Sequence, residues 1–319
     1  MRSTRRRPAL LAAALAPVTI LLSSCVAPAG APAVGRAPAH ASATTPARPP
    51  LAPVVRVPEL HFDGARASQG ALLRGRVTPA DSTLTLDGRP VPLAADGSFI
   101  VAFDRDAAGE ASLRAQNSAG AAEIPIAVAV FDWPIERVNA RITGGAVTSD
   151  EFRARRAGEL ARIADARARV AAAAATGPAA SDGWGQDFIL PVEGRISGRF
   201  GRQRIYRGEP GSYHSGMDIA APAGTPFVAP ADGVVVLAAT APFTLEGLLL
   251  IVDHGMGLSS SFLHASRLDV AQGDRVRQGQ PLGLVGATGR ATGPHMHWGM
   301  RWGDSRIDPE RVARDRRGE

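Results

Sequence analysis

Two Asp-Gly pairs limit the folds open to this chain more than any other feature of its sequence. Asp87-Gly88 and Asp96-Gly97 each stand between short segments in which apolar and polar residues alternate. The apolar positions of these segments are Leu84, Leu86, Val91, Leu93, Phe99, Val101 and Phe103. An Asp-Gly pair between alternating segments is a strong signal of a β-hairpin. The pattern predicts a β-meander, and we expect residues 54–140 to form a small β-sandwich of immunoglobulin-like type.

The C-terminal part of the chain is also predicted to be β-structure. Between Phe188 and about Val312, short apolar runs such as G-V-V-V-L and L-L-L-I-V are separated by glycine turns. Apolar runs of this length, bounded by glycine, are typical of strands. We expect a domain over residues 184–312 built on a largely antiparallel sheet, which makes the whole chain mainly β.

One helical segment is predicted between the two β-regions. Thr148 and Glu151 have the spacing of a capping box at the start of a helix. The apolar residues that follow near helical spacing are Phe152, Leu160, Ile163 and Val170. The helix should end in the alanine run before Gly177-Pro178. We therefore predict a helical connector over residues 145–176, with its acidic and basic residues on a solvated face.

The N-terminus has the features of an export signal. Residues 1–24 combine a basic start with an apolar run that is too short to span a bilayer comfortably. Leu22-Ser23-Ser24-Cys25 resembles the lipobox of bacterial lipoproteins, in which the cysteine is lipidated and becomes the new N-terminus. The resemblance implies a lipoprotein signal peptide and a membrane anchor on Cys25, with an ordinary cleaved signal as the alternative. Arg5-Arg6 only weakly suggests twin-arginine export, so the export route stays open.

The composition argues against nucleic acid as a partner. The formal net charge is +6, but four of the arginines lie in the first 24 residues, so the mature chain would be nearly neutral. A bias toward Ala, Arg, Gly and Pro without any lysine is more simply explained by a GC-rich coding sequence than by a basic binding surface. Residues 25–53 are rich in Ala and Pro and should form a semi-extended tether. Cys25 is the single cysteine, so no intramolecular disulfide can form.

Histidines cluster in the C-terminal part, where five of the seven fall between His214 and His297. Asp218 follows His214 by four residues, and His295 and His297 are separated by one residue. In a strand, residues i and i+2 point to one face about 7 Å apart, so both imidazoles of H-M-H can face one cavity. A histidine, a carboxylate and a second histidine make the ligand set of catalytic zinc, with the fourth position left to water. The other histidine of the pair and His264 could then carry protons, because the unperturbed imidazole pKa is near working pH.

Three segments that contain these residues resemble the signature motifs of the lysostaphin/LytM-type zinc metallopeptidases, which are peptidoglycan endopeptidases with the duplicated hybrid motif fold. The segments are G-S-Y-H-S-G-M-D-I-A, F-L-H-A-S and T-G-P-H-M-H-W, and the similarity extends from about residue 190 to residue 309. Carried over residue by residue, the resemblance implies Zn²⁺ as cofactor with His214, Asp218 and His297 as its ligands. It also implies that His264 and His295 are the catalytic histidines that transfer protons.

Other residues near the motifs are predicted to have structural roles. His254, in V-D-H-G, matches a family position that is not a ligand, and it should support the end of a strand. Trp298 should point away from the H-M-H histidines and into packing. Phe262 departs from the family, in which tyrosine is frequent at this position, so Tyr206 or Tyr213 could supply a hydroxyl instead.

The resemblance implies a zinc-dependent endopeptidase that hydrolyses peptide cross-links of bacterial cell-wall peptidoglycan. One alternative is a non-enzymatic, peptidoglycan-binding activator of other wall hydrolases. Another is an envelope lipoprotein in which the N-terminal module does the work, as a binding module or as a structural spacer. Lipid on Cys25 would anchor the protein in the cell envelope, on the periplasmic side of the outer membrane in a Gram-negative organism. The bond that is cut, the oligomeric state, the protein partners and any blocking of the groove by the connector are left open.

Overall fold

The computed structural model describes residues 56–62, 67–138, 150–176 and 181–314. The chain separates into one unit over residues 1–52 and a second unit over residues 53–319, and all described residues belong to the second. The predicted signal peptide, Cys25, the tether and Thr148 lie outside the described residues.

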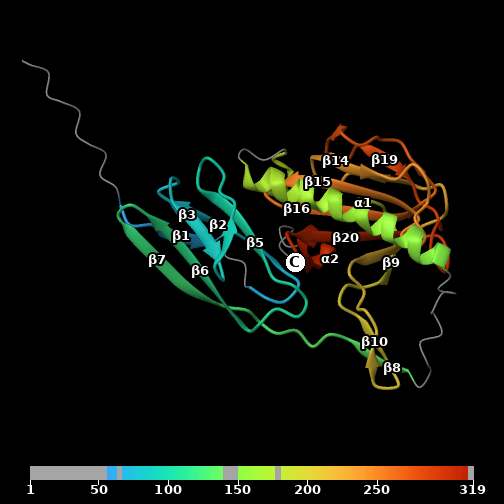
Figure 1. The fold of residues 1–319 in the computed structure, drawn as a ribbon, viewed down its shortest axis with the longest axis horizontal. Helices are drawn as coiled ribbons and strands as arrows, with labels where there is room; N and C mark the ends of the chain where they lie inside the picture. The colour runs from blue at the N-terminus through green and yellow to red at the C-terminus, as the bar shows by residue number, and fades with distance from the viewer. Residues whose placement is uncertain (1–55, 63–66, 139–149, 177–180, 315–319) are drawn as a thin grey trace, which may run out of the picture. The chain divides into compact units, whose positions relative to one another are not determined.

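The N-terminal module consists of two antiparallel sheets around one apolar core (Figure 1). Its strands are β1 (Glu59–Phe62), β2 (Leu72–Thr78), β3 (Thr83–Leu86), β4 (Arg89–Val91), β5 (Ser98–Ala102), β6 (Glu110–Asn117) and β7 (Gly120–Ala127). Their orders in the two sheets are β1-β2-β5 and β4-β3-β6-β7. Phe99 from the first sheet and Leu113 from the second are fully buried in the shared core. The module is therefore a β-sandwich, and its immunoglobulin-like topology stays a prediction.

The first Asp-Gly pair forms the predicted hairpin turn, between β3 and β4. Asp87 and Gly88 have φ of 49° and 75°, as a two-residue type I′ turn requires. After the second pair, β5 joins β2 in the other sheet, so the predicted simple meander is wrong. The physical reason is the close approach of Gly97 to β2, where a Cβ would stand 2.1 Å from the Val77 carbonyl oxygen. A side chain at this position would clash with β2, so only glycine allows the chain to pass this close to it.

The C-terminal part is built on an eight-stranded and a three-stranded antiparallel sheet. The large sheet contains β9 (Arg195–Gly198), β12 (Met217–Ala220), β14 (Gly233–Ala238), β15 (Leu248–Gly255), β16 (Leu258–Ala265), β18 (Arg275–Val276), β20 (Met296–Trp302) and β21 (Ser305–Ile307). The small sheet contains β13 (Pro226–Val228), β17 (Arg267–Leu268) and β19 (Pro281–Leu284). Phe262 and Trp298 of the large sheet share a core with Phe227 of the small one. The mainly β, antiparallel fold expected from the sequence is confirmed.

A small three-stranded sheet joins a strand that follows the N-terminal module to two strands of the C-terminal part. β8 (Ile135–Val138) runs parallel to β10 (Gln203–Tyr206), which pairs in turn with β11 (Glu209–Pro210). Two short helices are also described, η1 (Gly183–Gly185) and α2 (Pro309–Arg314). Leu72, Ile100 and Ala102 of the N-terminal module pack in the same cluster as the C-terminal sheets. The domain boundaries given above stay predictions.

The helix α1 (Asp150–Ala175) lies along β14 and β15 of the large sheet (Figure 1). Ile251 of β15 packs in the cluster of the helix, whereas its neighbours Leu250 and Val252 pack in the cluster of the small sheet. Because successive side chains of a strand point to opposite faces, the helix covers one face of the large sheet and the small sheet covers the other. No helix among the described residues is long and apolar enough to cross a membrane.

Two details of the predicted helix are wrong. Leu160, expected on the apolar face, is 49% exposed, whereas its neighbour Glu159 is buried. Glu159, which stands four residues before the buried Ile163, therefore lies in line with the apolar stripe. The charged residues are not all solvated either, because the Glu159 carboxylate accepts hydrogen bonds from Arg156 and from the backbone and hydroxyl of Thr244.

Candidate metal centre

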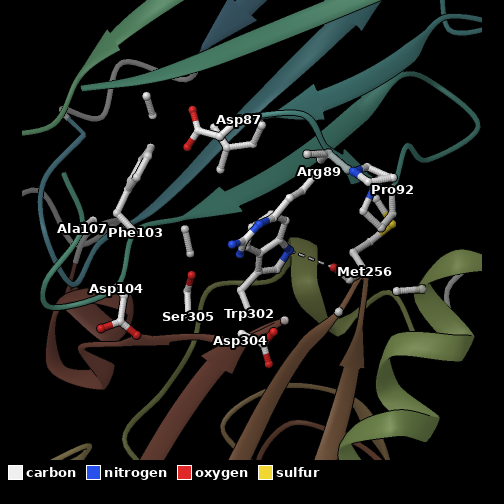
Figure 2. A pocket seen from close by; sticks show the side chains of 18 of the residues that line it. Asp87, Arg89, Pro92, Phe103, Asp104, Ala107, Met256, Trp302, Asp304 and Ser305 are labelled. Atoms are coloured by element: carbon white, nitrogen blue, oxygen red, sulfur yellow. Dashed lines mark hydrogen bonds between the residues drawn. The ribbon is translucent and has the colours of Figure 1, made fainter. Parts of the chain in front are cut away.

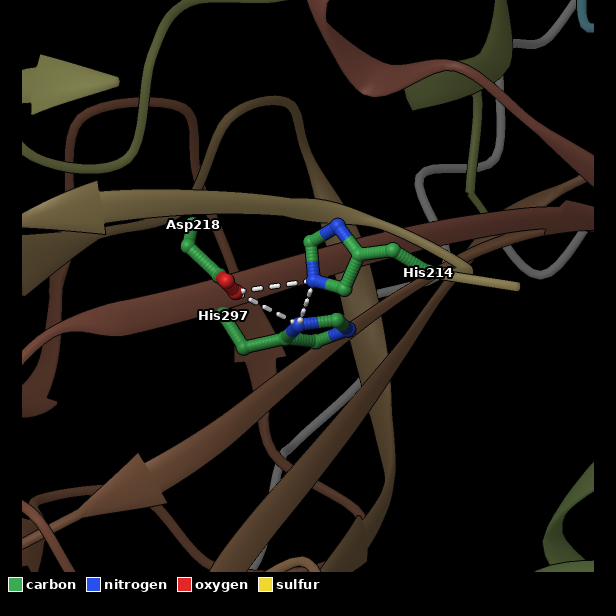
Figure 3. A group of neighbouring side chains, drawn as sticks. All are labelled: His214, Asp218 and His297. Atoms are coloured by element: carbon green, nitrogen blue, oxygen red, sulfur yellow. Dashed lines mark hydrogen bonds and ion pairs between the residues drawn. The ribbon is translucent and has the colours of Figure 1, made fainter. Parts of the chain in front are cut away.

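The three predicted ligands come from two neighbouring strands and from the turn before one of them. Asp218 in β12 and His297 in β20 are direct partners in the antiparallel register. His214 lies just before β12, and its imidazole points at the same place (Figure 3). Strand pairing thus brings together two side chains that are 79 positions apart in the sequence.

The three side chains present nitrogen and oxygen atoms at close range. Asp218 Oδ1 lies 3.0 Å from His214 Nε2 and 2.8 Å from His297 Nδ1. The two imidazole nitrogens are 3.1 Å apart. One ligand atom from each residue lies within 4.8 Å of the other two, which is a spacing that one metal ion could bridge.

The hydrogen bond on the far side of His214 determines which of its nitrogens can bind a metal. Nδ1 lies 2.9 Å from the carbonyl oxygen of Arg199, and because a carbonyl can only accept, Nδ1 carries the proton. In the neutral ring, Nε2 therefore presents a lone pair toward Asp218 and His297. A carbonyl on the second nitrogen is a common way to orient a metal-binding imidazole. The convergence of two imidazoles and one carboxylate fits Zn²⁺.

Burial and charge influence the protonation of these groups. Burial alone would raise the pKa of Asp218, but the hydrogen bonds and charges of His214 and His297 outweigh it, so this pKa is lowered. Burial lowers the pKa of His297 and keeps its ring neutral. Burial also opposes protonation of His214, yet the hydrogen bond to Asp218 and its charge leave the pKa of His214 raised. Because a proton and a metal compete for His214 Nε2, metal binding should weaken on acidification.

The two predicted catalytic histidines lie beside the ligand set. His264 is in β16 and His295 directly precedes β20, and their ring centroids are 4.9 Å apart. His295 Nε2 lies 3.7 Å from Asp218 Oδ1. The centroid of the His264 ring is 6.4 Å from that of His297. The fold therefore brings all five predicted site residues to one place.

Both of these histidines are oriented by backbone carbonyls. Nδ1 of His264 donates to the Thr288 carbonyl and Nδ1 of His295 donates to the Gly293 carbonyl, each at 2.8 Å. Each neutral ring thus has its lone pair at Nε2. Burial, and then the charges of His295 and His297, lower the pKa of His264. His264 is accordingly neutral near pH 7 and able to accept a proton at Nε2.

His254 and Trp298 lie in the interior on the other side of the strands, where both are completely buried. Trp298 Nε1 donates to Ser260 Oγ at 3.1 Å, and Ser260 Oγ lies 2.8 Å from His254 Nε2. His254 Nδ1 donates to the carbonyl of Asp232 at 2.8 Å. Every polar atom in this chain of hydrogen bonds has a partner, which is the arrangement expected of a structural histidine.

Among the described side chains, Tyr213 is the one suggested source of a hydroxyl whose contacts can be followed. Phe262 is completely buried and packs against Phe227 with ring centroids 5.5 Å apart. The Tyr213 hydroxyl donates to Asp104 of the N-terminal module at 3.1 Å. The side chain of Tyr206 lies outside the described residues. The suggested hydroxyl from Tyr213 is therefore occupied by another contact.

Sequence reasoning missed two kinds of contact around the site. The carbonyls that orient the histidines belong to the backbone, so no residue type marks them in the sequence. The contact between Asp104 and Tyr213 joins positions that are 109 residues apart, in the N-terminal module and next to the metal centre. No periodicity or motif in the segment around Asp104 points to such a partner.

A separate pocket of about 690 Å³ is lined by residues other than the site histidines, and Figure 2 shows part of its wall. Its wall includes Phe103, Met256 and Trp302, and Trp302 Nε1 donates to the Met256 carbonyl at 3.1 Å. None of the five predicted site residues lines it. We place the candidate site at the histidine cluster, because the groups able to bind a metal and transfer protons converge there.

The fold and the site together define a class of protein: a mainly β chain with a candidate centre for one metal ion and two further imidazoles beside it. Residues 212–309 match the sequence profile of peptidase family M23. The chain belongs to this family, as its signature segments indicated.

Relatives of the chain include two enzymes with curated names. This chain is 40% identical over 117 residues to the peptidoglycan DD-endopeptidase ShyA of Vibrio cholerae, and the match covers 35% of this chain and 26% of ShyA. It is 39% identical over 123 residues to the DD-carboxypeptidase/endopeptidase Mpg of Neisseria meningitidis, covering 37% of this chain and 27% of Mpg. The matches thus span about a quarter of the length of these relatives.

A solved structure extends the similarity beyond the family segment. The crystal structure of a protein from Pseudomonas aeruginosa assigned to peptidase M23 is 30% identical, with a TM-score of 0.57. The alignment covers 78% of this chain and 96% of that one. Such coverage includes residues well outside 212–309, so the similarity of fold is not limited to the segment that carries the histidines.

Proposed function

We propose that this protein is a zinc-dependent endopeptidase that hydrolyses peptide cross-links of bacterial cell-wall peptidoglycan. The observation that carries the proposal is the convergence of the His214, Asp218 and His297 ligand atoms with the imidazoles of His264 and His295. The names of the relatives support the choice of substrate, since ShyA is a peptidoglycan DD-endopeptidase and Mpg is a DD-carboxypeptidase/endopeptidase. By this comparison, the bond cut would be a D,D cross-link.

The metal would be held by His214 Nε2, the Asp218 carboxylate and His297 Nδ1. When bound, Zn²⁺ supplies Lewis acidity for a peptide carbonyl and for the attacking water. Asp218 contributes a full negative charge, since its pKa is lowered, and His297 contributes a neutral ring. The Arg199 carbonyl keeps the His214 proton on Nδ1 and leaves Nε2 free for the ion.

The two other histidines would carry the protons. His264 is neutral near pH 7 and its Nε2 can accept a proton from water, while the Thr288 carbonyl holds the ring in place. His295 Nε2 faces Asp218, and the Gly293 carbonyl orients that ring in the same way. A pair of imidazoles on one side of the ligand set can thus take a proton from water and return one to the leaving amine.

The decisive experiment is digestion of purified sacculi by the soluble, zinc-loaded protein, followed by mass analysis of the released muropeptides. The proposal predicts that cross-linked dimers decrease and monomers with an unaltered glycan increase. Zinc bound at one ion per chain without any change in the muropeptides would favour the alternative of a non-enzymatic, peptidoglycan-binding activator. No observation among the described residues favours that alternative at present.

The cellular location would follow from a lipid on Cys25, which lies outside the described residues. The lipobox-like sequence before Cys25 supports a lipid-anchored protein of the cell envelope, on the periplasmic side of the outer membrane in a Gram-negative cell. Metabolic labelling with a palmitate analogue should label the wild type but not Cys25→Ser. Equal labelling of both proteins would exclude this anchor.

A further inference from the structure

The backbone around His214 is held by the segment that precedes it. The Gly201 N–H donates to the His214 carbonyl at 2.9 Å, and the His214 N–H donates to the Arg202 carbonyl at 2.8 Å. The imidazole donates to the Arg199 carbonyl, which belongs to the same segment. The position of His214 Nε2 in the metal centre therefore depends on the position of residues 199–202.

Arg105 of the N-terminal module contacts this segment, the residue that follows it and the residue before His214. Its Nε donates to the Gly201 carbonyl at 2.9 Å, and Nη2 donates to Gln203 Oε1 at 3.2 Å. Its guanidinium carbon lies 4.9 Å from the centre of the Tyr213 ring, within the range of a cation–π contact. Only 6% of Arg105 is exposed, so these contacts are shielded from solvent in the folded protein. One buried side chain thus contacts Tyr213, which precedes His214 in the sequence, and Gly201, which is hydrogen-bonded to the His214 backbone.

Trp133 also packs against Gly201. Gly201 has a φ of 81°, and a Cβ built on it would lie 2.0 Å from the Trp133 ring. Trp133 Nε1 donates to the Arg105 carbonyl at 3.0 Å, which ties the two supporting residues together. Asp104 completes the contact, because it accepts the Tyr213 hydroxyl at 3.1 Å.

These contacts do more than join the module to the C-terminal part. The N-terminal module is also bound to the C-terminal part by the Asp308 N–H, which donates to the Gly70 carbonyl at 2.8 Å. Arg311 adds to this connection, because its Nη1 donates to Ser68 Oγ at 2.9 Å and to the Gln69 carbonyl at 3.1 Å. A chain without the Arg105 guanidinium keeps this second connection. What it loses is the support of residues 199–214.

We propose that Arg105 is a positioning residue of the metal centre, and that the N-terminal module thereby forms part of the support of His214. The inference rests on the metal ligands of the proposed function but not on its substrate. Groups that orient a metal ligand without touching the ion typically change metal affinity by about 10- to 100-fold when they are removed. The module is then more than a spacer, since its Asp104-Arg105 pair completes a site whose ligands all lie over 100 residues later in the chain.

The test is the zinc affinity of full-length variants, measured at 25 °C by competition with a chromophoric chelator. Arg105→Ala should raise the Kd for zinc by about 10- to 100-fold, in the range known for removed support of a ligand. Arg105→Lys keeps the charge but cannot reach Gly201 and Gln203 together. Its Kd for zinc should therefore lie between that of the wild type and that of Arg105→Ala. The control is Arg76→Ala, which removes an exposed arginine of the same module paired with Asp96 and should bind zinc like the wild type.

Thermal unfolding of the metal-free proteins shows whether each variant is folded at 25 °C. If Arg105→Ala is not folded, Arg105→Lys decides the question by the same measurement. A Kd within about twofold of the wild type in the folded Arg105 variant would overturn the proposal. Hydrolysis of peptidoglycan plays no part in this readout. A protein that binds zinc in this Arg105-dependent way but releases no muropeptides would contradict the proposed function alone, and a wild type that binds no zinc would contradict both.

Discussion

At the scale of the residue, His295 and His297 differ in the nitrogen that each presents to Asp218. His297 presents Nδ1 at 2.8 Å, at the distance of a direct contact. His295 presents Nε2 at 3.7 Å, because its Nδ1 is engaged by the Gly293 carbonyl. Two identical side chains in H-M-H therefore have different geometry, which agrees with the proposed roles of His297 as a metal ligand and His295 as a proton carrier.

Alanine variants of the two histidines should behave differently. We expect His297→Ala to lose stoichiometric zinc and activity together, because a ligand is removed. His295→Ala should retain zinc and lose about 10²- to 10⁴-fold in the rate of muropeptide release, the range of general acid–base catalysis. Metal analysis and the digestion rate check both expectations, with His61→Ala, an exposed histidine of β1, as control. Full activity of His295→Ala would remove that residue from the mechanism.

His254 and Asp253 are adjacent residues of β15 whose pKa values are shifted in opposite directions. Burial lowers the pKa of His254 to about 4. Burial raises the pKa of Asp253 to about 6, against the effect of the hydrogen bond from the Gly255 N–H. On acidification from pH 6.5 to 4, the unfolded chain gains a proton at His254 that the native state does not, so stability falls. Over about the same range the native state gains a proton at Asp253 that the unfolded chain does not, so stability rises.

Removing the Asp253 carboxylate should reveal the opposite effects of His254 and Asp253 on the pH dependence of stability. Asp253→Asn keeps an acceptor for the Gly255 N–H and removes the cost of a buried charge, which is present above pH 6 and absent at pH 4. The metal-free variant should therefore be more stable than the wild type by about 1–3 kcal/mol at pH 7 and about equally stable at pH 4. Urea unfolding at the two pH values measures the difference. The same difference at both would show that Asp253 does not titrate in this range.

At the scale of the element, α1 attaches to the loop between β14 and β15 through charge as well as apolar packing. Glu159 binds Thr244, and Arg156 makes two hydrogen bonds to Glu246, at 2.6 and 2.7 Å. The Glu246 carbonyl accepts the backbone N–H of His264 at 2.8 Å. The helix is therefore connected through one loop to His264, which we propose as a catalytic histidine.

Substitutions at two adjacent positions of α1 test this attachment. Glu159→Ala leaves the N–H of Thr244 without its buried acceptor, whereas Arg156 keeps its hydrogen bonds to Glu246, and we expect the variant to lower the free energy of unfolding by about 1–3 kcal/mol. Leu160→Ala changes a side chain that is 49% exposed and should alter stability by about 0.5 kcal/mol or less. Denaturant unfolding of both variants measures the contrast. A larger effect at Leu160 than at Glu159 would contradict the observed orientation of the helix.

At the scale of the whole molecule, the N-terminal module and the C-terminal part share contacts that neither keeps alone. Leu72 and Ile100 of the module pack in the core cluster of the C-terminal sheets. The buried Arg105 reaches the segment that holds His214. Because these contacts include buried apolar side chains, we expect the two parts to stabilise each other.

Deletion of residues 56–131 should therefore affect the C-terminal part. We expect a lower melting temperature, increased binding of a hydrophobic dye and weaker zinc binding, because apolar surface and the support of His214 are both lost. Calorimetry and dye fluorescence provide the measurements. An unchanged melting temperature and zinc Kd would show that the module is an independent spacer.

Local patterns of residues were sufficient to predict the mainly β class, the antiparallel sheets and the segments that contain the candidate site. These features depend on local patterns: Asp87-Gly88 adopts the positive φ angles of a hairpin turn, and H-M-H places alternate side chains on one side of a strand. The sequence also indicated the M23 family, because the three motifs occur in order along the chain.

The contact partners of these residues depend on the tertiary fold and could not be predicted from local patterns. Leu160 and Glu159 differ by one position, and the docking of α1 on the sheet determines which of them is buried. The carbonyls of Arg199, Thr288 and Gly293 select the proton positions of three histidines. Arg105 reaches Gly201 across 96 positions. Such contacts follow from packing over long sequence separations, which no local pattern of residue types encodes.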